Sequence, residues 1–335
     1  MKLNRFIVLC TVVLCIISCS GNRFKVDVSS VSYKAEFKRL DKEMFALHSP
    51  ISEATSVNLN EEYGDFFGAY TQDIMQMPPP DNPMLPEFIS RFTNNPTWQN
   101  LQADIDETYP NLSTKERVLE NALKAYSIHF GETNLPMLVA YNSGFNIGIY
   151  PSDDWLGVGL EWYLSPENGT VKKLPPDLFP QYKRDKMKPE YLAINALKGF
   201  LFYKNQNLAG EDMLSSMVFN GKMLFIAKAL MEVSDADLLN YSDQQIDWAK
   251  DNEYSVWTFL IENDLVFSKD QKQIAKMVND GPFTPGMPPE SPGGVGNWVG
   301  LQMVEAFMDQ KGTYSLKDLL KAGDREILEQ YKPGR

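Results

Sequence analysis

The sequence is poor in cysteine and histidine. Its three cysteines are Cys10, Cys15 and Cys19, and its only histidines are His48 and His129. A protease-type zinc site needs two imidazoles one helical turn apart, and nucleophilic triads usually need a histidine as base. The composition therefore excludes a histidine-based zinc site. It also leaves no imidazole after residue 129 for a Ser-His-Asp or Cys-His arrangement.

Positive charge and long apolar runs are also scarce. Aspartate and glutamate total 44 against 32 lysines and arginines, which gives a formal net charge of −12. A body this acidic is repelled by phosphate backbones, so nucleic acid is not an expected partner. After the first residues, no apolar run approaches the roughly 20 residues that a membrane-spanning helix needs. Attachment to a membrane would have to come from the N-terminus.

The N-terminus has the layout of an exported protein. Lys2 and Arg5 precede an apolar run over residues 6–17, as in a secretory signal peptide. Residues 16–19, Ile-Ile-Ser-Cys, resemble the lipobox of bacterial lipoproteins, in which the cysteine is acylated and becomes the new N-terminus. We therefore expect a signal peptide over 1–18 and a lipidated N-terminus with a polar tether over 19–32. The alternative is an ordinary signal peptide that happens to contain cysteines.

A lipid on Cys19 would be the only membrane anchor visible in the sequence. Several acyl chains, palmitate among them, hold a protein far more firmly than one chain does. No acidic run follows Cys19, because the next residues are Ser-Gly-Asn-Arg, and this argues against display on the cell surface. The expected location is the outer membrane, with the body facing the periplasm.

Helical periodicity covers most of the remaining chain. Apolar residues recur at helical spacing over residues 59–77, 83–95, 97–109, 113–130, 191–205, 213–231, 242–267 and 297–308. Strand signals are confined to 137–141, 145–150 and 158–164, with a shorter candidate at 36–41 leading into a helix near Phe45. We predict an α+β fold, predominantly α-helical, with a small central sheet. Its expected parts are a mainly helical region over 33–135 and an α+β region over 136–335.

Five short motifs follow one another along the chain. They are Phe37-x-Arg39-x-Asp41, Leu-Gly-Val-Gly-Leu-Glu-Trp-Tyr-Leu at 156–164, Trp248 with Glu253 and Trp257, Glu290-Ser-Pro-Gly, and Gly296-x-Trp298-Val-Gly. In this order they resemble the gliding motility lipoprotein GldB family of the Bacteroidetes, over nearly the whole mature chain. The resemblance implies a cell-envelope lipoprotein needed for gliding and linked to the type IX secretion apparatus. It implies no known reaction.

That family is in turn similar to zinc metalloproteases of the gluzincin type, which implies a degenerate zincin-like C-terminal half. Residues 194–198 take the place of His-Glu-x-x-His, with Ile194 and Lys198 at the ligand positions and Asn195 at the general base. Asn220 stands where a glutamate ligand is found in the active enzymes. Isoleucine cannot bind zinc, and neither can a protonated lysine. We therefore expect a pseudo-protease with no catalytic residues, no metal and no cofactor.

Carboxylates near aromatic residues leave a second chemistry open. A glycosidase needs only two suitably spaced acids, and Asp251, Glu253, Glu262, Glu290 and the Asp153–Asp154 pair are candidates. The plainer interpretation is that Asp251 and Glu253 lie on a solvated helix face. The glycine-rich loop 290–298 lacks the Lys-Ser/Thr of a nucleotide-binding loop, so we expect it to form a tight turn that packs Trp298.

The favoured function is a non-enzymatic component of the gliding and type IX secretion machinery that acts through protein contacts. The alternatives are a carboxylate-based hydrolase of envelope glycan or peptidoglycan, and a periplasmic ligand-binding lipoprotein with a deep cleft. If a surface or cleft carries the function, its candidate residues are Asn195, Lys198, Asn220, Glu253, Glu290 and Trp298.

Overall fold

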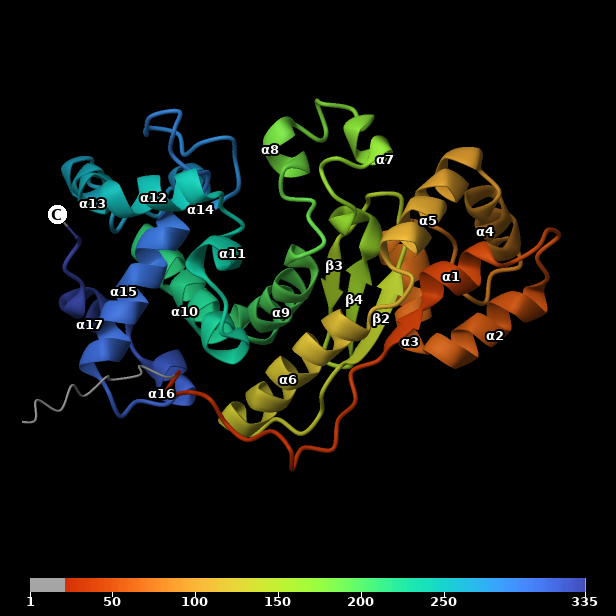
Figure 1. Ribbon diagram of the computed structural model, residues 1–335, viewed down its shortest axis with the longest axis horizontal. Coiled ribbons are helices and arrows are strands. Elements are labelled where there is room, and N and C mark those ends of the chain that lie inside the picture. The colour runs from red at the N-terminus through yellow and green to blue at the C-terminus, as the bar shows by residue number, and fades with distance from the viewer. Residues whose placement is uncertain (1–21, 335) are drawn as a thin grey trace, which may run out of the picture.

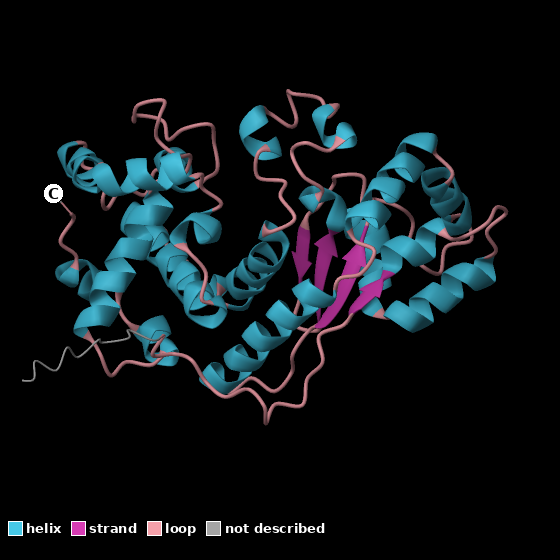
Figure 2. Cartoon of the chain, viewed as in Figure 1, coloured by secondary structure: helices cyan, strands magenta, loops and turns pink. Residues whose placement is uncertain are grey.

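A four-stranded sheet forms the middle of the fold, in a computed structural model that describes residues 22–334. The strand order is β1-β2-β4-β3, with bounds Phe37–Arg39 (β1), Met137–Tyr141 (β2), Ile149–Pro151 (β3) and Trp155–Gly159 (β4). β1, β2 and β4 run parallel, and β3 pairs antiparallel with β4 at the edge. Helices occupy most of the remaining chain (Figure 2). The predicted class, mostly helical α+β with a small sheet, is confirmed.

Helices lie on both sides of this sheet, with α9 between the sheet and α10 (Figure 1). Those before β2 are α1 (Leu40–Phe45), α2 (Glu53–Tyr63), α3 (Asp65–Ala69), α4 (Leu85–Thr93), α5 (Pro96–Thr108) and α6 (Ser113–Phe130). Those after β4 are α7 (Gly169–Lys172), α8 (Gln181–Arg184), α9 (Tyr191–Lys204), α10 (Met213–Met231), α11 (Asp235–Leu239), α12 (Asp243–Asp251), α13 (Glu253–Glu262), α14 (Gln271–Val278), α15 (Gly296–Gln310), α16 (Leu316–Lys321) and α17 (Asp324–Gln330).

The two faces of the sheet belong to two separate apolar clusters. Side chains alternate along a strand, so Leu138 and Ala140 point to one face and Val139 and Tyr141 to the other. The first face joins a large cluster that includes α6, α9, α10 and α15. The second face packs against a smaller cluster from α1 to α4, rich in phenylalanine and tyrosine. Because β1 comes from the region 33–135, the sheet is built from both expected regions.

Two glycines allow α10 and α15 to pack closely. A Cβ on Gly221 of α10 would overlap the carbonyl oxygen of Gly300, and a Cβ on Gly300 of α15 would overlap the carbonyl oxygen of Met217. Only glycine leaves room for such backbone approach. α10 is also the one helix in the described chain long and apolar enough to cross a membrane, and 72% of its apolar window is buried inside the fold. It is the central core helix.

The segment expected as a tether packs against the body over its described part. Phe24, Val26 and Val28 are partly buried against the large cluster, as is Tyr33, the first residue after the expected tether. The Tyr33 hydroxyl donates to the carbonyl of Pro136 at 2.7 Å, just before β2. Cys19 and the signal peptide lie outside the described residues, so the structure gives no account of the acylation site.

Several predicted elements differ in extent from the observed ones. The expected helix 242–267 is two helices, α12 and α13, separated at Asn252, although its predicted Ser242–Gln245 capping box is present. The expected helix 59–77 is interrupted at Gly64, where φ is +57°. The expected strand 158–164 is the end of β4 followed by a 3₁₀ turn, Leu160–Tyr163. After α15 the chain continues through α16 and α17, which the sequence analysis did not foresee.

Candidate functional site

Two of the candidate residues, Lys198 of α9 and Asn220 of α10, line one hollow of about 530 Å³. Its other walls are mostly apolar, from Phe202, Phe219, Leu224, Leu238 and Leu239. The Lys198 ammonium donates to the carbonyl of Leu238 at 2.7 Å. Burial lowers the pKa of Lys198 to about 7, because the charged form loses its hydration. Of the positions that the protease resemblance aligned, Lys198 and Asn220 are thus the two that line this hollow.

The two asparagines aligned with protease residues are both engaged in hydrogen bonds. Asn220 donates to the Asn297 side chain at 2.7 Å, and Asn297 in turn donates to the Val278 carbonyl at 2.8 Å. These bonds join α10, α14 and the start of α15. The Asn195 side chain accepts from Asn240 at 3.0 Å and is not among the residues that line the hollow. Each amide is thus used to connect elements of the fold.

Glu290 is exposed at a second, larger cleft of about 900 Å³. This cleft lies between α8, the start of α9, α12 and the loop after α14. Its walls combine aromatic rings, Tyr182, Tyr191 and Trp248, with amide and carboxyl groups. An ion pair between Lys186 and Asp280, 2.5 Å long, joins the two sides. Of the candidate residues, Glu290 is the one that this cleft exposes to solvent.

Glu253 is buried, so the interpretation that it lies on a solvated face is wrong. Only 9% of the residue is exposed. Its carboxylate accepts a hydrogen bond from the Tyr331 hydroxyl at 2.8 Å and one from the Gly334 N–H at 3.4 Å. The carboxylate therefore fixes the C-terminal residues on α13. It does not line the cleft of Glu290, so the structure does not assemble these two acids into one hydrolytic site.

Trp298 is also part of the core, with 3% of its surface exposed. The preceding loop is held by Thr284, whose hydroxyl donates to the Pro292 carbonyl at 2.7 Å and accepts from the Val295 N–H at 3.0 Å. Gly293 in this loop lies against the backbone of Gly281, where a Cβ would not fit. The predicted tight turn that packs Trp298 is confirmed, and Trp298 cannot serve as a contact surface.

A buried polar network that the sequence did not predict lies at the carboxyl ends of β1 and β2. Asp41 is 1% exposed and accepts two bonds from the Arg39 guanidinium, at 2.6 and 2.8 Å. Gln102 of α5 donates to Asp41 at 3.1 Å and accepts from Asn142 at 3.2 Å. The Phe-x-Arg-x-Asp motif marked two of these residues, but nothing in the sequence pointed to Gln102 or Asn142.

Glu161, in the 156–164 motif, is a second buried acid that was not among the predicted site residues. It is fully buried, and its Oε1 accepts from the Ser143 N–H at 2.8 Å, the Ser143 hydroxyl at 2.5 Å and the Phe145 N–H at 3.2 Å. The carboxylate holds a turn in which Gly144 and Phe145 both have positive φ. Burial raises the pKa of Glu161 to about 7 despite these donors.

Glu161→Gln is expected to change how stability depends on pH. The folded carboxyl holds its proton up to about pH 7 and the unfolded one to about 4.5, so wild-type stability should fall as pH rises between these values. The fall should be on the order of 3 kcal/mol. The amide keeps an acceptor for Ser143 and Phe145 but cannot ionise. Urea unfolding of both proteins from pH 4 to 8 should show this slope only in the wild type, and parallel curves would contradict it.

The part of the chain that the structure describes contains no group of three histidine, cysteine, aspartate or glutamate side chains placed to hold a metal ion. The sequence model of a family described as gliding motility protein GldB matches residues 21–333. No curated protein and no solved structure matches the chain.

Proposed function

The chain belongs to the GldB family of gliding motility lipoproteins, and we propose that it serves the gliding and type IX secretion machinery as a non-enzymatic component. The family match over residues 21–333 carries this proposal. The family's name as lipoproteins supports a lipid-anchored location in the cell envelope. The proposal adds four things to the family match. They are a role without catalysis, a link to the type IX machinery, action through protein contacts, and an outer-membrane position facing the periplasm.

The hydrogen bonding at the protease-like positions supports a role without catalysis. Asn195, Asn220 and Lys198 each bond to a neighbouring element of the fold. A general base or a metal ligand needs a free lone pair directed at its substrate or metal. Lys198 donates to the Leu238 carbonyl, and both asparagine amides have partners within the fold. These side chains connect α9, α10 and α11 to their neighbours.

Loss of the lipid is expected to damage function more than any change in the clefts. Cys19→Ala removes the only residue that can be acylated in the mature chain, because no other cysteine follows it. The protein should move from the membrane to the soluble envelope fraction, and gliding should be lost. Membrane fractionation and colony spreading measure the two effects. A soluble variant that restores gliding fully would contradict the proposal.

Glu290→Ala provides the matched comparison, because Glu290 is exposed and the change leaves the core intact. We expect this variant to remain in the membrane and to glide. Crosslinking of the wild-type protein in the native envelope, followed by mass spectrometry, should recover gliding or secretion components. If Glu290→Ala abolishes gliding in a folded and abundant protein, the 900 Å³ cleft carries chemistry or ligand binding instead.

A further inference from the structure

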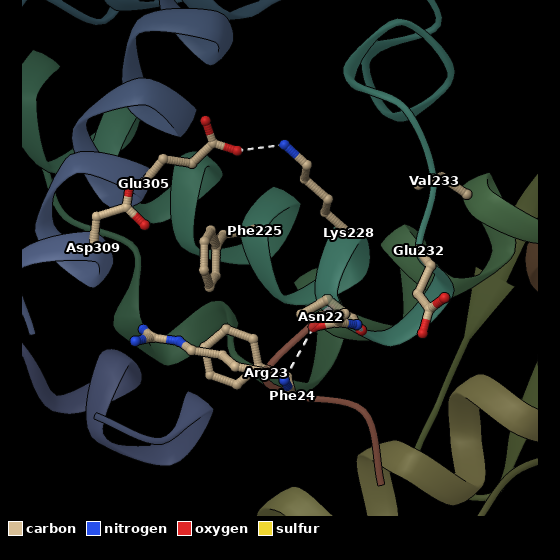
Figure 3. A pocket seen from close by; sticks show the side chains of 10 residues that line it. Asn22, Arg23, Phe24, Phe225, Lys228, Glu232, Val233, Glu305 and Asp309 are labelled. Atoms are coloured by element: carbon tan, nitrogen blue, oxygen red, sulfur yellow. Dashed lines mark hydrogen bonds and ion pairs between the residues drawn. The ribbon is translucent and has the colours of Figure 1, made fainter. Parts of the chain in front are cut away.

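The first described residues are fastened to the ends of two core helices (Figure 3). Asn22 donates from its side chain to the carbonyl of Ala229, in the last turn of α10, at 2.6 Å. The Arg23 guanidinium donates to the carbonyls of Met308 and Gly312, both at 2.8 Å, at the end of α15. The last carbonyls of a helix lack partners within it and carry partial negative charge, so they bind a cation well.

Phe24 and Lys25 continue this attachment. The ring of Phe24 packs edge-on against Phe225 of α10, with 5.7 Å between centroids, and the carbonyl of Phe24 lies 2.8 Å from His129 Nε2 of α6. Lys25 forms an exposed ion pair with Glu232 at 3.1 Å, which adds little stability. Residues 22–25 are thus fixed by α6, α10 and α15 at once.

This attachment leaves very little free chain before the body. Three peptide units separate Cys19 from Asn22 and span at most about 11 Å. A free tether over 19–32 would instead have had a root-mean-square reach of about 20 Å and would have let the body turn in any direction. Given the lipid on Cys19 proposed above, the end of the chain that enters the membrane emerges beside the C-terminal ends of α10 and α15.

We propose that this part of the surface, formed by residues 22–25 and 309–313 and called here the anchor face, lies against the lipid headgroups. The anchor face carries Arg23, Lys25 and Lys311 against a single acid, Asp309. Two neighbouring acids, Glu232 and Glu326, pair with Lys25 and Lys311, so the charge of this part of the surface is nearly balanced. The chain as a whole carries a formal charge of −12. The anchor face is therefore repelled by anionic headgroups less than the average surface is.

The anchor face and the 900 Å³ cleft lie on opposite sides of the molecule. Residues 22–33 run along the lower side in Figure 1, near α16, whereas α8, α12 and α14 lie along the upper side. The cleft is lined by residues of α8 and α12 and by Glu290. With the anchor face on the membrane, the elements that line the cleft lie on the side of the body away from the bilayer, where a soluble or cell-wall partner can reach them.

Site-specific labels in liposomes test this orientation. The mature chain has no cysteine besides the acylated Cys19, so Thr313→Cys on the anchor face and Gln244→Cys at the cleft each give one reactive thiol on an exposed residue. The full lipidated protein is placed in phosphatidylethanolamine–phosphatidylglycerol vesicles, and a fluorophore on each thiol is quenched by headgroup nitroxides. We expect several-fold stronger quenching at position 313 than at 244. Equal quenching, or stronger quenching at 244, would overturn the proposal.

A linker variant tests whether the short chain sets the orientation. An insert of about twelve Gly/Ser residues between Gly21 and Asn22 keeps every contact of residues 22–25 but lengthens the free chain. The difference between the two labels should then shrink, and an unchanged difference would contradict the argument. Flotation of the same vesicles measures whether the protein is attached to the membrane, independently of its orientation. Protein that fails to float disproves the lipid on Cys19, whereas protein that floats with equal quenching disproves only the orientation.

Discussion

Asp41→Ala is expected to lower the free energy of unfolding by about 3 to 5 kcal/mol, the usual cost of removing one partner of a buried ion pair. The side chain of Asp41 has no solvent exposure, and that of Arg39 has 17%. Without the carboxylate, the guanidinium keeps the Tyr109 carbonyl, at 3.1 Å, as its closest acceptor. Gln102 also loses one acceptor and keeps Asp106, at 3.2 Å, so the cost comes from donors on both side chains that lose their bond to Asp41. Urea unfolding measures the change.

An exposed ion pair gives the control for this prediction. Arg91 and Glu87 lie one turn apart on α4 at 3.0 Å, with side chains 70% and 59% exposed. Glu87→Ala should change the free energy of unfolding by no more than about 0.5 kcal/mol, because water replaces the lost partner. If the two variants were equally stable, the network around Asp41 would not contribute to the fold as described.

Gly300→Ala is expected to lower the free energy of unfolding by about 3 kcal/mol, which is the upper end of the usual cost of overpacking a core. The added methyl group would overlap the Met217 carbonyl oxygen, which belongs to backbone and cannot rotate away. α10 and α15 would have to separate along the contact where Gly221 also lies against Gly300. Because both helices belong to the large core cluster, the separation would disturb packing on either side.

Gly169→Ala is the matched control, since it is the same substitution at a helical glycine. A Cβ on Gly169, the first residue of α7, would have no heavy atom within 4 Å. We expect the control to keep wild-type stability or to gain a few tenths of a kcal/mol from the better helix propensity of alanine. A melting temperature for Gly300→Ala equal to that of the control would show that α10 and α15 do not pack through these glycines.

Local signals in the sequence predicted most of the elements and several of their ends. The Ser242–Gln245 capping box, the short strand before Phe45 and the turn that packs Trp298 were each predicted from residues within a few positions of one another. The predicted helices 59–77 and 242–267 were too long, because the apolar periodicity continues across the helix breaks at Gly64 and Asn252. A turn of the chain there leaves the apolar spacing almost unchanged, so periodicity alone does not reveal it.

The sequence by itself determined the family, the fold class and the absence of histidine pairs, because these depend on composition and on short motifs in a fixed order. Tertiary structure alone decided which polar residues are buried. Glu253 faces inward because Tyr331, 78 positions away, donates to it. Residues 22–25 are part of the body because Asn22 reaches Ala229, 207 positions away. Contacts at such separations leave no periodic trace, since each depends on the path of the whole chain.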